Sequence, residues 1–197
     1  MHFSVISASH QKKSNSLKVA RYIDHFLNLQ DQSHIIDLRD ANLPIWTPEV
    51  FDDSNVAARW KKIDKALKAS DGFVFVTPEY AGMATPILKN FLLFAGSSHL
   101  GHKPVLIVSV SSGIGGSYPI SELRASSYKN NRLCYVPDHI IVRYADKVLN
   151  EKEAVDDSDK VTRHRIADGI HTLRAYTAAL SEMREKNTLS AEFPNGM

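Results

Sequence analysis

Short runs of consecutive apolar residues alternate along this chain with longer segments in which apolar residues recur every three or four positions. The continuous runs are typical of strands buried on both faces, and the longer segments are typical of amphipathic helices. Strands are expected within residues 3–6, 34–38, 72–76, 104–110 and 133–142, the last interrupted by Pro137. Helical spacing runs from Val19 to Leu27, Val56 to Leu67, Ile87 to Ala95 and Ile166 to Leu180, and a further helix is expected over residues 117–130. This alternation predicts a parallel sheet with helices on both faces, because parallel strands need crossover connections.

Length and composition are those of a single globular domain. The chain has 197 residues, of which 43% are hydrophobic and 23% are charged. These values are ordinary for such a domain. We expect one α/β domain over residues 1–185 and a polar tail over residues 186–197. The net charge of +2 gives no basis for nucleic-acid binding.

The expected location is cytoplasmic. The single cysteine, Cys134, excludes an internal disulfide and fits a reducing compartment, where it is expected to be a small core residue. Residues 7–16 are too polar for the apolar part of a signal peptide. No apolar run approaches the roughly 20 residues of a membrane span, so no membrane partner is expected.

The loop after the first expected strand, residues 7–16, is rich in hydroxyl and amide side chains and ends where a helix begins. Backbone N–H groups and the helix dipole make such a position a candidate anion site, and phosphate is one anion that binds there. Ser14 or Asn15 is also expected to cap the helix. Capping and phosphate binding do not exclude each other.

The stretch from Thr77 to Asn90 follows the central strand and combines proline, glutamate, tyrosine and glycine in one loop. Thr85-Pro86 predicts a helix start, with a hydroxyl at the N-cap and proline at the first helical position. The loop therefore lies at the carboxyl end of a central strand, where open α/β sheets bind their ligands. Together with the hydroxyl-rich first loop, it predicts a flavodoxin-like three-layer αβα fold with a five-stranded sheet in the order 2-1-3-4-5.

The fourth expected strand leads into a glycine-rich loop, residues 111–117. Its glycines permit positive φ and a close approach of the backbone to a flat ligand, so we expect Gly113 to admit no bulky side chain. The loop is no dinucleotide fingerprint, because Tyr118 stands where the last glycine should be, and it lacks a P-loop lysine. A hydrolase nucleophile elbow needs a glycine two residues before its serine, and Ser109 and Val110 stand at those positions before Ser111 and Ser112. A flexible turn without a ligand remains the alternative.

Residues 39–54 are expected to form a long irregular loop, with Trp46 between two prolines. Its apolar side chains would cover a ligand or a partner subunit, or pack on the surface. The first two are favoured, because loops of this length are often functional. With Met83 in the neighbouring loop, an exposed Trp46 would form an apolar patch beside the ligand cleft. Such a patch is typical of an interaction site. No metal site is expected, because His99 and His102 have no third ligand at a suitable spacing.

The chain resembles the NADPH-dependent FMN reductase family, flavodoxin-like proteins that include azo- and quinone-reducing members. The resemblance spans about residues 3–137 and rests on these segments: Ser9 and Ser14, Thr77-Pro78-Glu79-Tyr80 with Leu88-Lys89-Asn90, Lys103-Pro104-Val105, Ser111-Ser112-Gly113 to Gly116, and Leu123-Arg124. Two departures concern the loops. The family's phosphate-loop arginine is replaced by Gln11, which removes a charge-assisted contact, and the asparagine that usually follows the tyrosine is replaced by Ala81.

The resemblance implies an oxidoreductase that uses FMN to pass a hydride from NADPH or NADH to a flavin, a quinone or a similar small acceptor. The implied cofactor-binding residues are Ser9, Gln11, Ser14, Asn15 and Ser16 at the phosphate, Pro78, Glu79, Tyr80, Ala81 and Gly82 at one edge of the isoalloxazine, and Ser112, Gly113 and Gly116 at the other. No catalytic side chain is implied, because the flavin supplies the chemistry. Glu79 is expected to be a capping or ion-pairing group rather than a proton donor. The resemblance also implies a homodimer or homotetramer with the flavin near the subunit contact.

Two alternatives remain open from the residues. One is an electron-transfer module that binds FMN but turns over no pyridine nucleotide. The other is a protein of the same fold that has lost flavin and works through interaction, which the altered first loop favours.

Overall fold

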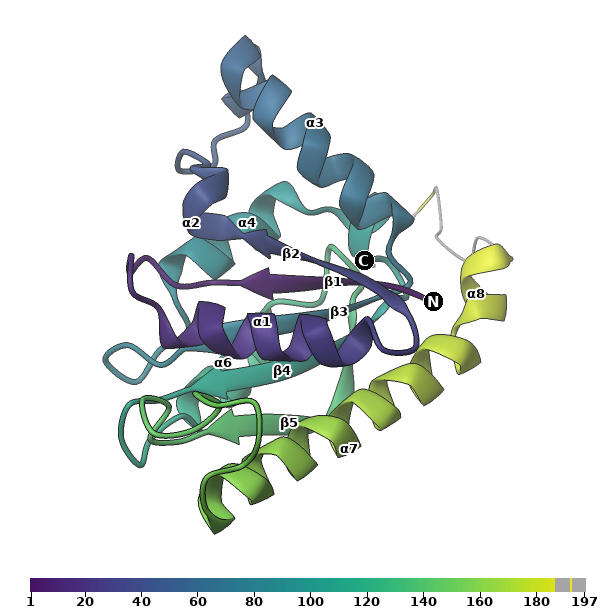
Figure 1. Cartoon of the computed structure of the whole chain (residues 1–197). Helices are drawn as coiled ribbons and strands as arrows, with labels where there is room; N and C mark the ends of the chain where they lie inside the picture. Colours follow the sequence, from purple (N-terminus) through teal and green to yellow (C-terminus); the bar gives the residue numbers. More distant parts are fainter. Residues whose placement is uncertain (187–191, 193–197) are drawn as a thin grey trace.

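The computed structural model describes residues 1–186 and residue 192. Parallel strands form a sheet in the order β2-β1-β3-β4-β5 (Figure 1). The strands are β1 (His2–Ser7), β2 (Gln32–Asp37), β3 (Gly72–Pro78), β4 (Pro104–Val110) and β5 (Cys134–Val142). The predicted order is confirmed. The strand order reverses between β1 and β3, so a cleft is expected at their carboxyl ends.

Helices cover both faces of this sheet (Figure 1). One face carries α1 (Asn15–Leu27) and α7 (Asp157–Ala179), which leads into α8 (Ser181–Glu185). The other face carries α3 (Ser54–Ala69), α4 (Pro86–Phe94) and α6 (Tyr118–Ser126), together with the short elements α2 (Leu38–Ala41), η1 (Val50–Asp52) and α5 (Ser97–Leu100). The three-layer prediction is therefore confirmed.

Alternate residues of the central strands belong to different cores. On β3, Phe73 and Phe75 pack in the layer of α3 and α4, whereas Val74 and Val76 pack in the layer of α1 and α7. All four side chains are fully buried. Because both faces of each central strand are covered, these strands are continuous apolar runs rather than alternating ones.

Strand β5 contains the interruption that Pro137 predicts. Val105 pairs with Tyr135 and Ile107 pairs with His139, so β5 has two residues more than β4 between these partners. Proline has no N–H to donate to a ladder, and an irregularity of this kind accommodates it. The guanidinium of Arg124 on α6 donates to the carbonyls of Val136, Pro137 and Asp138, which gives the irregular segment its hydrogen-bond donors.

Two expectations about local structure were wrong. Helix α6 ends at Ser126 rather than near residue 130. The hydroxyls of Ser126 and Ser127 donate to carbonyls four residues earlier, a side-chain interaction that competes with helix continuation. The segment 39–54 is not irregular throughout, because it holds the end of α2 and the turn η1, with Asp37 accepting a hydrogen bond at the start of α2.

The described residues include all of residues 1–185, the range of the expected domain. Of the expected polar tail, residues 187–191 and 193–197 lie outside the described part. Within residues 1–186 and 192, no helix combines the length and the apolar composition that crossing a membrane requires.

Candidate functional site

The loops after β1, β3 and β4 meet at one edge of the sheet and enclose a cavity of about 60 Å³. The lining residues are Ser9, Gln11, Asn15 and Ser16 from the first loop and α1, Pro78, Glu79 and Tyr80 from β3 and its loop, and Val110 and Ser112 from β4 and its loop. All of them except Val110 were predicted as cofactor-binding residues. Val110 was missed because it ends an apolar strand and has the pattern of an ordinary core residue.

The first turn of α1 offers free hydrogen-bond donors to this cavity. Ser14 is the N-cap, and its hydroxyl accepts a hydrogen bond from the N–H of Leu17 at 3.0 Å. Among the described residues, the N–H groups of Asn15 and Ser16 have no acceptor. Unpaired N–H groups at a helix start are the donors that bind phosphate in other proteins. The capping interpretation of Ser14 is thus confirmed, and Ser14 itself does not line the cavity.

Tyr80 joins the β3 loop to the β1 loop. Its hydroxyl lies 3.1 Å from the hydroxyl of Ser9, which also accepts a hydrogen bond from the N–H of Gln11 at 3.2 Å. Ser9 is only 3% exposed. The cavity is much smaller than the roughly 300 to 1,000 Å³ of a complete ligand site. Tyr80 and Ser9 therefore join the two loops at this cavity.

Ala81, which stands where relatives usually have an asparagine, lies in a tight turn. Tyr80 and Met83 exchange backbone hydrogen bonds of 3.1 and 2.9 Å, and Ala81 and Gly82 between them have φ values of 49° and 71°. Two consecutive positive φ angles characterise a type I′ turn, for which asparagine followed by glycine is the preferred pair. Alanine at the first position is strained, typically by about 1 kcal/mol. Neither residue of the turn lines the small cavity.

Glu79 connects the β3 loop to the start of α6. Its carboxylate accepts hydrogen bonds from the N–H groups of Gly116 at 2.9 Å and Tyr118 at 3.1 Å. A carboxylate at a helix start is favoured by the helix dipole. A Cβ on Gly115 would lie 2.7 Å from the carboxylate, so glycine leaves room for it. The expectation that Glu79 is a capping group agrees with this geometry.

Glu122 is a second carboxylate between the same loops, and sequence reasoning missed it. It lies on α6, accepts a hydrogen bond from the N–H of Ala84 at 2.6 Å and forms an ion pair with Lys89 at 2.7 Å. Burial acts to raise the pKa of Glu122, but the hydrogen bonds from Lys89 and Ala84 outweigh it and lower the pKa. No local pattern marks a contact between residues 38 positions apart.

The glycine loop corrects one expectation. Gly113 does not have a positive φ, and a Cβ there would meet no atom of the chain within 4 Å. The residue that tolerates no side chain is Gly116, with φ of 109° and a Cβ position only 2.4 Å from the Cγ2 of Ile141. Neither glycine lines the small cavity. The requirement for glycine therefore comes from packing against β5, and only a bound ligand would restrict Gly113.

Of the alternatives for Trp46, the structure supports packing on its own chain. Trp46 is half-buried and packs against the core of its own chain, and its backbone N–H donates to the side-chain oxygen of Asn90 at 2.8 Å. The exposed side chain of this segment is its neighbour Ile45, at 85%. Met83 is exposed as expected, at 47%.

Comparison with known proteins agrees with the fold and with these loops. The profile of a family described as NADPH-dependent FMN reductase matches residues 1–147. The NADPH azoreductase of Bacillus sp. (strain OY1-2) is 28% identical over 191 residues, which cover 94% of this chain and 98% of that protein. The FMN-dependent NADPH-azoreductase of Staphylococcus aureus (strain USA300) is 28% identical over 170 residues, which cover 82% of this chain and 88% of that protein.

A solved structure shows the same fold. The crystal structure of an oxidoreductase from Corynebacterium diphtheriae superposes with a TM-score of 0.69 at 18% identity, covering 90% of this chain and 97% of that chain. The family profile covers more than half of the chain and includes all three loops that line the cavity. The resemblance seen in the sequence is thus confirmed, and the chain belongs to the NADPH-dependent FMN reductase family.

Proposed function

We propose that this protein is an NAD(P)H-dependent oxidoreductase that binds FMN across the β1, β3 and β4 loops and reduces a flavin, a quinone, an azo compound or a similar small acceptor. The observation that carries the proposal is the convergence of the three loops on one cavity, with the unpaired N–H groups of Asn15 and Ser16 at the start of α1. The family and the two azoreductase relatives support the same reaction class.

The residues present fit the two ends of FMN. At the phosphate end, the Asn15 and Ser16 N–H groups and the dipole of α1 favour an anion. At the ring end, the N–H groups of Ala81, Gly82 and Ser112 also have no acceptor among the described residues. Bound FMN would supply the hydride chemistry, since a flavin exchanges hydride without a protein acid or base.

The protein's own contribution is orientation and electrostatics. Unpaired N–H groups near the ring are preorganised donors that stabilise negative charge. The carboxylate of Glu79 is satisfied by the N–H groups of Gly116 and Tyr118, and it thereby fixes the loops on either side of the ring site. No side chain is assigned a proton-transfer role.

A charge reversal at the phosphate end tests the proposal. Asn15→Asp adds a carboxylate where helix dipoles favour one, so the fold should keep its stability, while the new charge repels a phosphate. The dissociation constant of FMN is expected to rise about 100-fold, or about 2.7 kcal/mol. Riboflavin, which lacks the phosphate, should change less than about threefold. Both constants are measured by quenching of flavin fluorescence.

The matched control is Asn55→Asp, the same change in the first turn of α3, far from the cavity. It should leave the dissociation constants of both flavins unchanged. An Asn15→Asp protein that loses FMN and riboflavin equally would contradict a phosphate site at α1, and a wild-type protein that binds neither flavin would contradict the proposed function.

We also infer a homodimer, or a homotetramer built from such dimers. The support is an apolar groove of about 670 Å³ between α2 with its following loop and α4, bordered by Ile45 and Leu93, which are 85% and 59% exposed. Exposed Met83 precedes α4 in the chain. Exposed apolar side chains beside a cleft are typical of protein contacts, and a contact here would cover part of the flavin site.

Ile45→Glu is expected to shift the protein to monomers at micromolar concentration, because burying a carboxylate in an apolar contact is unfavourable. Sedimentation velocity measures the shift, and NAD(P)H oxidation should fall with it. Leu29→Glu, at a position 65% exposed in the turn between α1 and β2, is the control and should leave the assembly intact. A wild-type monomer with full reductase activity would contradict this assembly.

A cytoplasmic location completes the proposal. Cys134 is a free, half-buried thiol whose pKa is raised by burial, and it forms no disulfide within the described residues. A single unpaired thiol fits a reducing compartment.

A further inference from the structure

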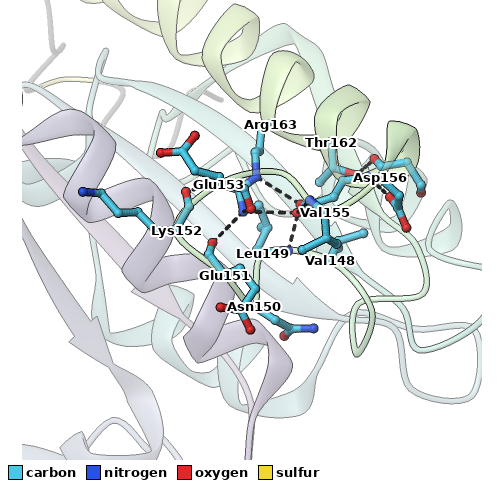
Figure 2. Close-up of polar contacts among 12 residues, drawn as sticks. Val148, Leu149, Asn150, Glu151, Lys152, Glu153, Val155, Asp156, Thr162 and Arg163 are labelled. Carbon is cyan, nitrogen blue, oxygen red and sulfur yellow. Dashed lines mark hydrogen bonds and ion pairs between the residues drawn. The ribbon is translucent and has the colours of Figure 1, made fainter.

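The loop between β5 and α7, residues 143–156, is held by an ion pair on α7 between Asp159 and Arg163. Figure 2 shows Arg163 beside this loop. Asp159 is completely buried and accepts hydrogen bonds from the N–H groups of Leu149 at 2.9 Å and Val155 at 3.3 Å. Burial acts to raise the pKa of Asp159, but the Arg163 guanidinium and these N–H groups lower it, so the carboxylate stays charged. One buried carboxylate thus fixes two points of the loop.

Arg163 supplies the matching donors. Its guanidinium lies 3.1 Å from Asp159 and donates to the carbonyls of Glu151, Lys152 and Glu153 at distances between 2.7 and 3.3 Å (Figure 2). Three consecutive carbonyls on one guanidinium make a planar, preorganised contact that lysine cannot reproduce. The polar centre therefore specifies one conformation of the loop.

Lys18 on α1 holds the same loop from the other side. Its ammonium donates to the carbonyls of Ala145 at 2.5 Å and Val148 at 2.8 Å and to the side chain of Asn150 at 2.7 Å. Lys18 lies in the helix whose first turn borders the cavity. The loop is thereby tied both to α7 and to the helix proposed to bind phosphate.

The start of the loop supports the glycine loop after β4. The N–H groups of Tyr144 and Ala145 donate to the carbonyls of Gly113 at 3.2 Å and Ser111 at 3.0 Å, and the Arg143 side chain donates to Ile114 at 2.6 Å. The backbone of residues 111–114, which faces the proposed ring site, therefore rests on residues 143–145.

Backbone strain shows that the loop conformation is imposed from outside. Tyr144 and Leu149 have φ values of 46° and 57°, which residues other than glycine and asparagine rarely adopt. Such residues keep this conformation only when the surrounding contacts over-determine it. The contacts that do so here are those of Asp159 and Lys18.

We propose that Asp159, Arg163 and Lys18 are positioning residues for the flavin ring, acting through residues 143–149 on the glycine loop. The inference rests on the proposed function, because it takes the glycine loop to border the ring. Asp159 and Arg163 lie beyond residues 1–147, the part of the chain that matches the family profile. They are therefore a feature of this chain that the family comparison does not describe.

The first test needs no flavin. Arg163→Met removes the three carbonyl contacts while keeping the hydrophobic length of the side chain. The amides of Tyr144 and Ala145 are expected to exchange hydrogen about tenfold faster in native conditions, because local opening becomes easier. The matched control is Arg165→Met, which removes an exposed ion pair with Asp168 from the same helix. It should leave the exchange of these amides unchanged.

The second test measures ring binding. Arg163→Met is expected to weaken FMN and riboflavin by the same factor, about tenfold, because the displaced loop borders the ring that both flavins share. Asn15→Asp weakens FMN alone, so the two variants separate ring positioning from phosphate binding. A role in stability alone would lower the melting temperature and leave both dissociation constants of the folded protein unchanged, and that result would overturn the proposal.

A milder variant covers the case in which Arg163→Met does not fold, since it leaves the charge of Asp159 buried and unpaired. Lys18→Met removes the contacts of α1 to the same loop from a partly exposed position. It should accelerate hydrogen exchange at the same two amides. It should also weaken the binding of both flavins, by a common factor smaller than that in Arg163→Met. Unchanged exchange in Lys18→Met would overturn the proposal even if the wild-type protein bound no flavin.

Discussion

Gly116→Ala is expected to lower the free energy of unfolding by about 3 kcal/mol and to remove flavin binding. Two costs add in this variant. The φ of 109° is one that residues with a side chain rarely adopt, and the new Cβ would lie 2.4 Å from the Cγ2 of Ile141. Relief of that overlap requires the end of β5 or the segment before α6 to move, and movement of Gly116 breaks its hydrogen bond to Glu79. Urea unfolding and flavin titration measure the two effects.

Gly113 offers the matched comparison in the same loop. Gly113→Ala should leave the stability within about 0.5 kcal/mol, because its φ is ordinary and its Cβ position is open. Gly113→Val should keep the fold as well, but it should lower the affinity for flavins if the ring lies against this residue. Equal instability of the Gly113 and Gly116 variants would show that the loop conformation described here is wrong.

Glu79→Ala is expected to cost about 2 kcal/mol of stability and at least about tenfold in flavin affinity. The substitution leaves the N–H groups of Gly116 and Tyr118 without their acceptor and disconnects the β3 loop from the start of α6. Glu122 still joins Ala84 and Lys89, so the loops should separate only in part. Chemical unfolding and flavin titration test the expected losses.

Glu79→Gln separates a structural role from a proton-transfer role. Its amide oxygen still accepts a hydrogen bond, so stability and flavin affinity should fall less than in Glu79→Ala. With saturating flavin, the rate of NAD(P)H oxidation should stay close to that of the wild-type protein. A Gln variant that folds and binds flavin normally but has lost turnover would instead identify Glu79 as a proton donor.

The sequence by itself determined the layered fold and the location of the candidate site. Buried strands leave a continuous apolar signal and amphipathic helices leave a periodic one, so the sheet and its order were predictable. The three loops were predictable for the same reason, because each must follow the carboxyl end of its strand. Thr85-Pro86 and Pro137 also acted locally, at the start of α4 and at the irregularity in β5.

Only the tertiary structure decided which residues within these loops hold one another. Three carboxylates accept hydrogen bonds from backbone N–H groups far away in the sequence: Glu79 from Gly116, Glu122 from Ala84 and Asp159 from Leu149. No local pattern encodes these contacts. The conformational need for glycine fell on Gly116 rather than Gly113 because Ile141 of β5 packs against it. Trp46 turned inward and Ile45 outward for the same kind of reason. An apolar or flexible residue in a loop takes its role from the neighbouring elements, and those neighbours are set by the fold as a whole.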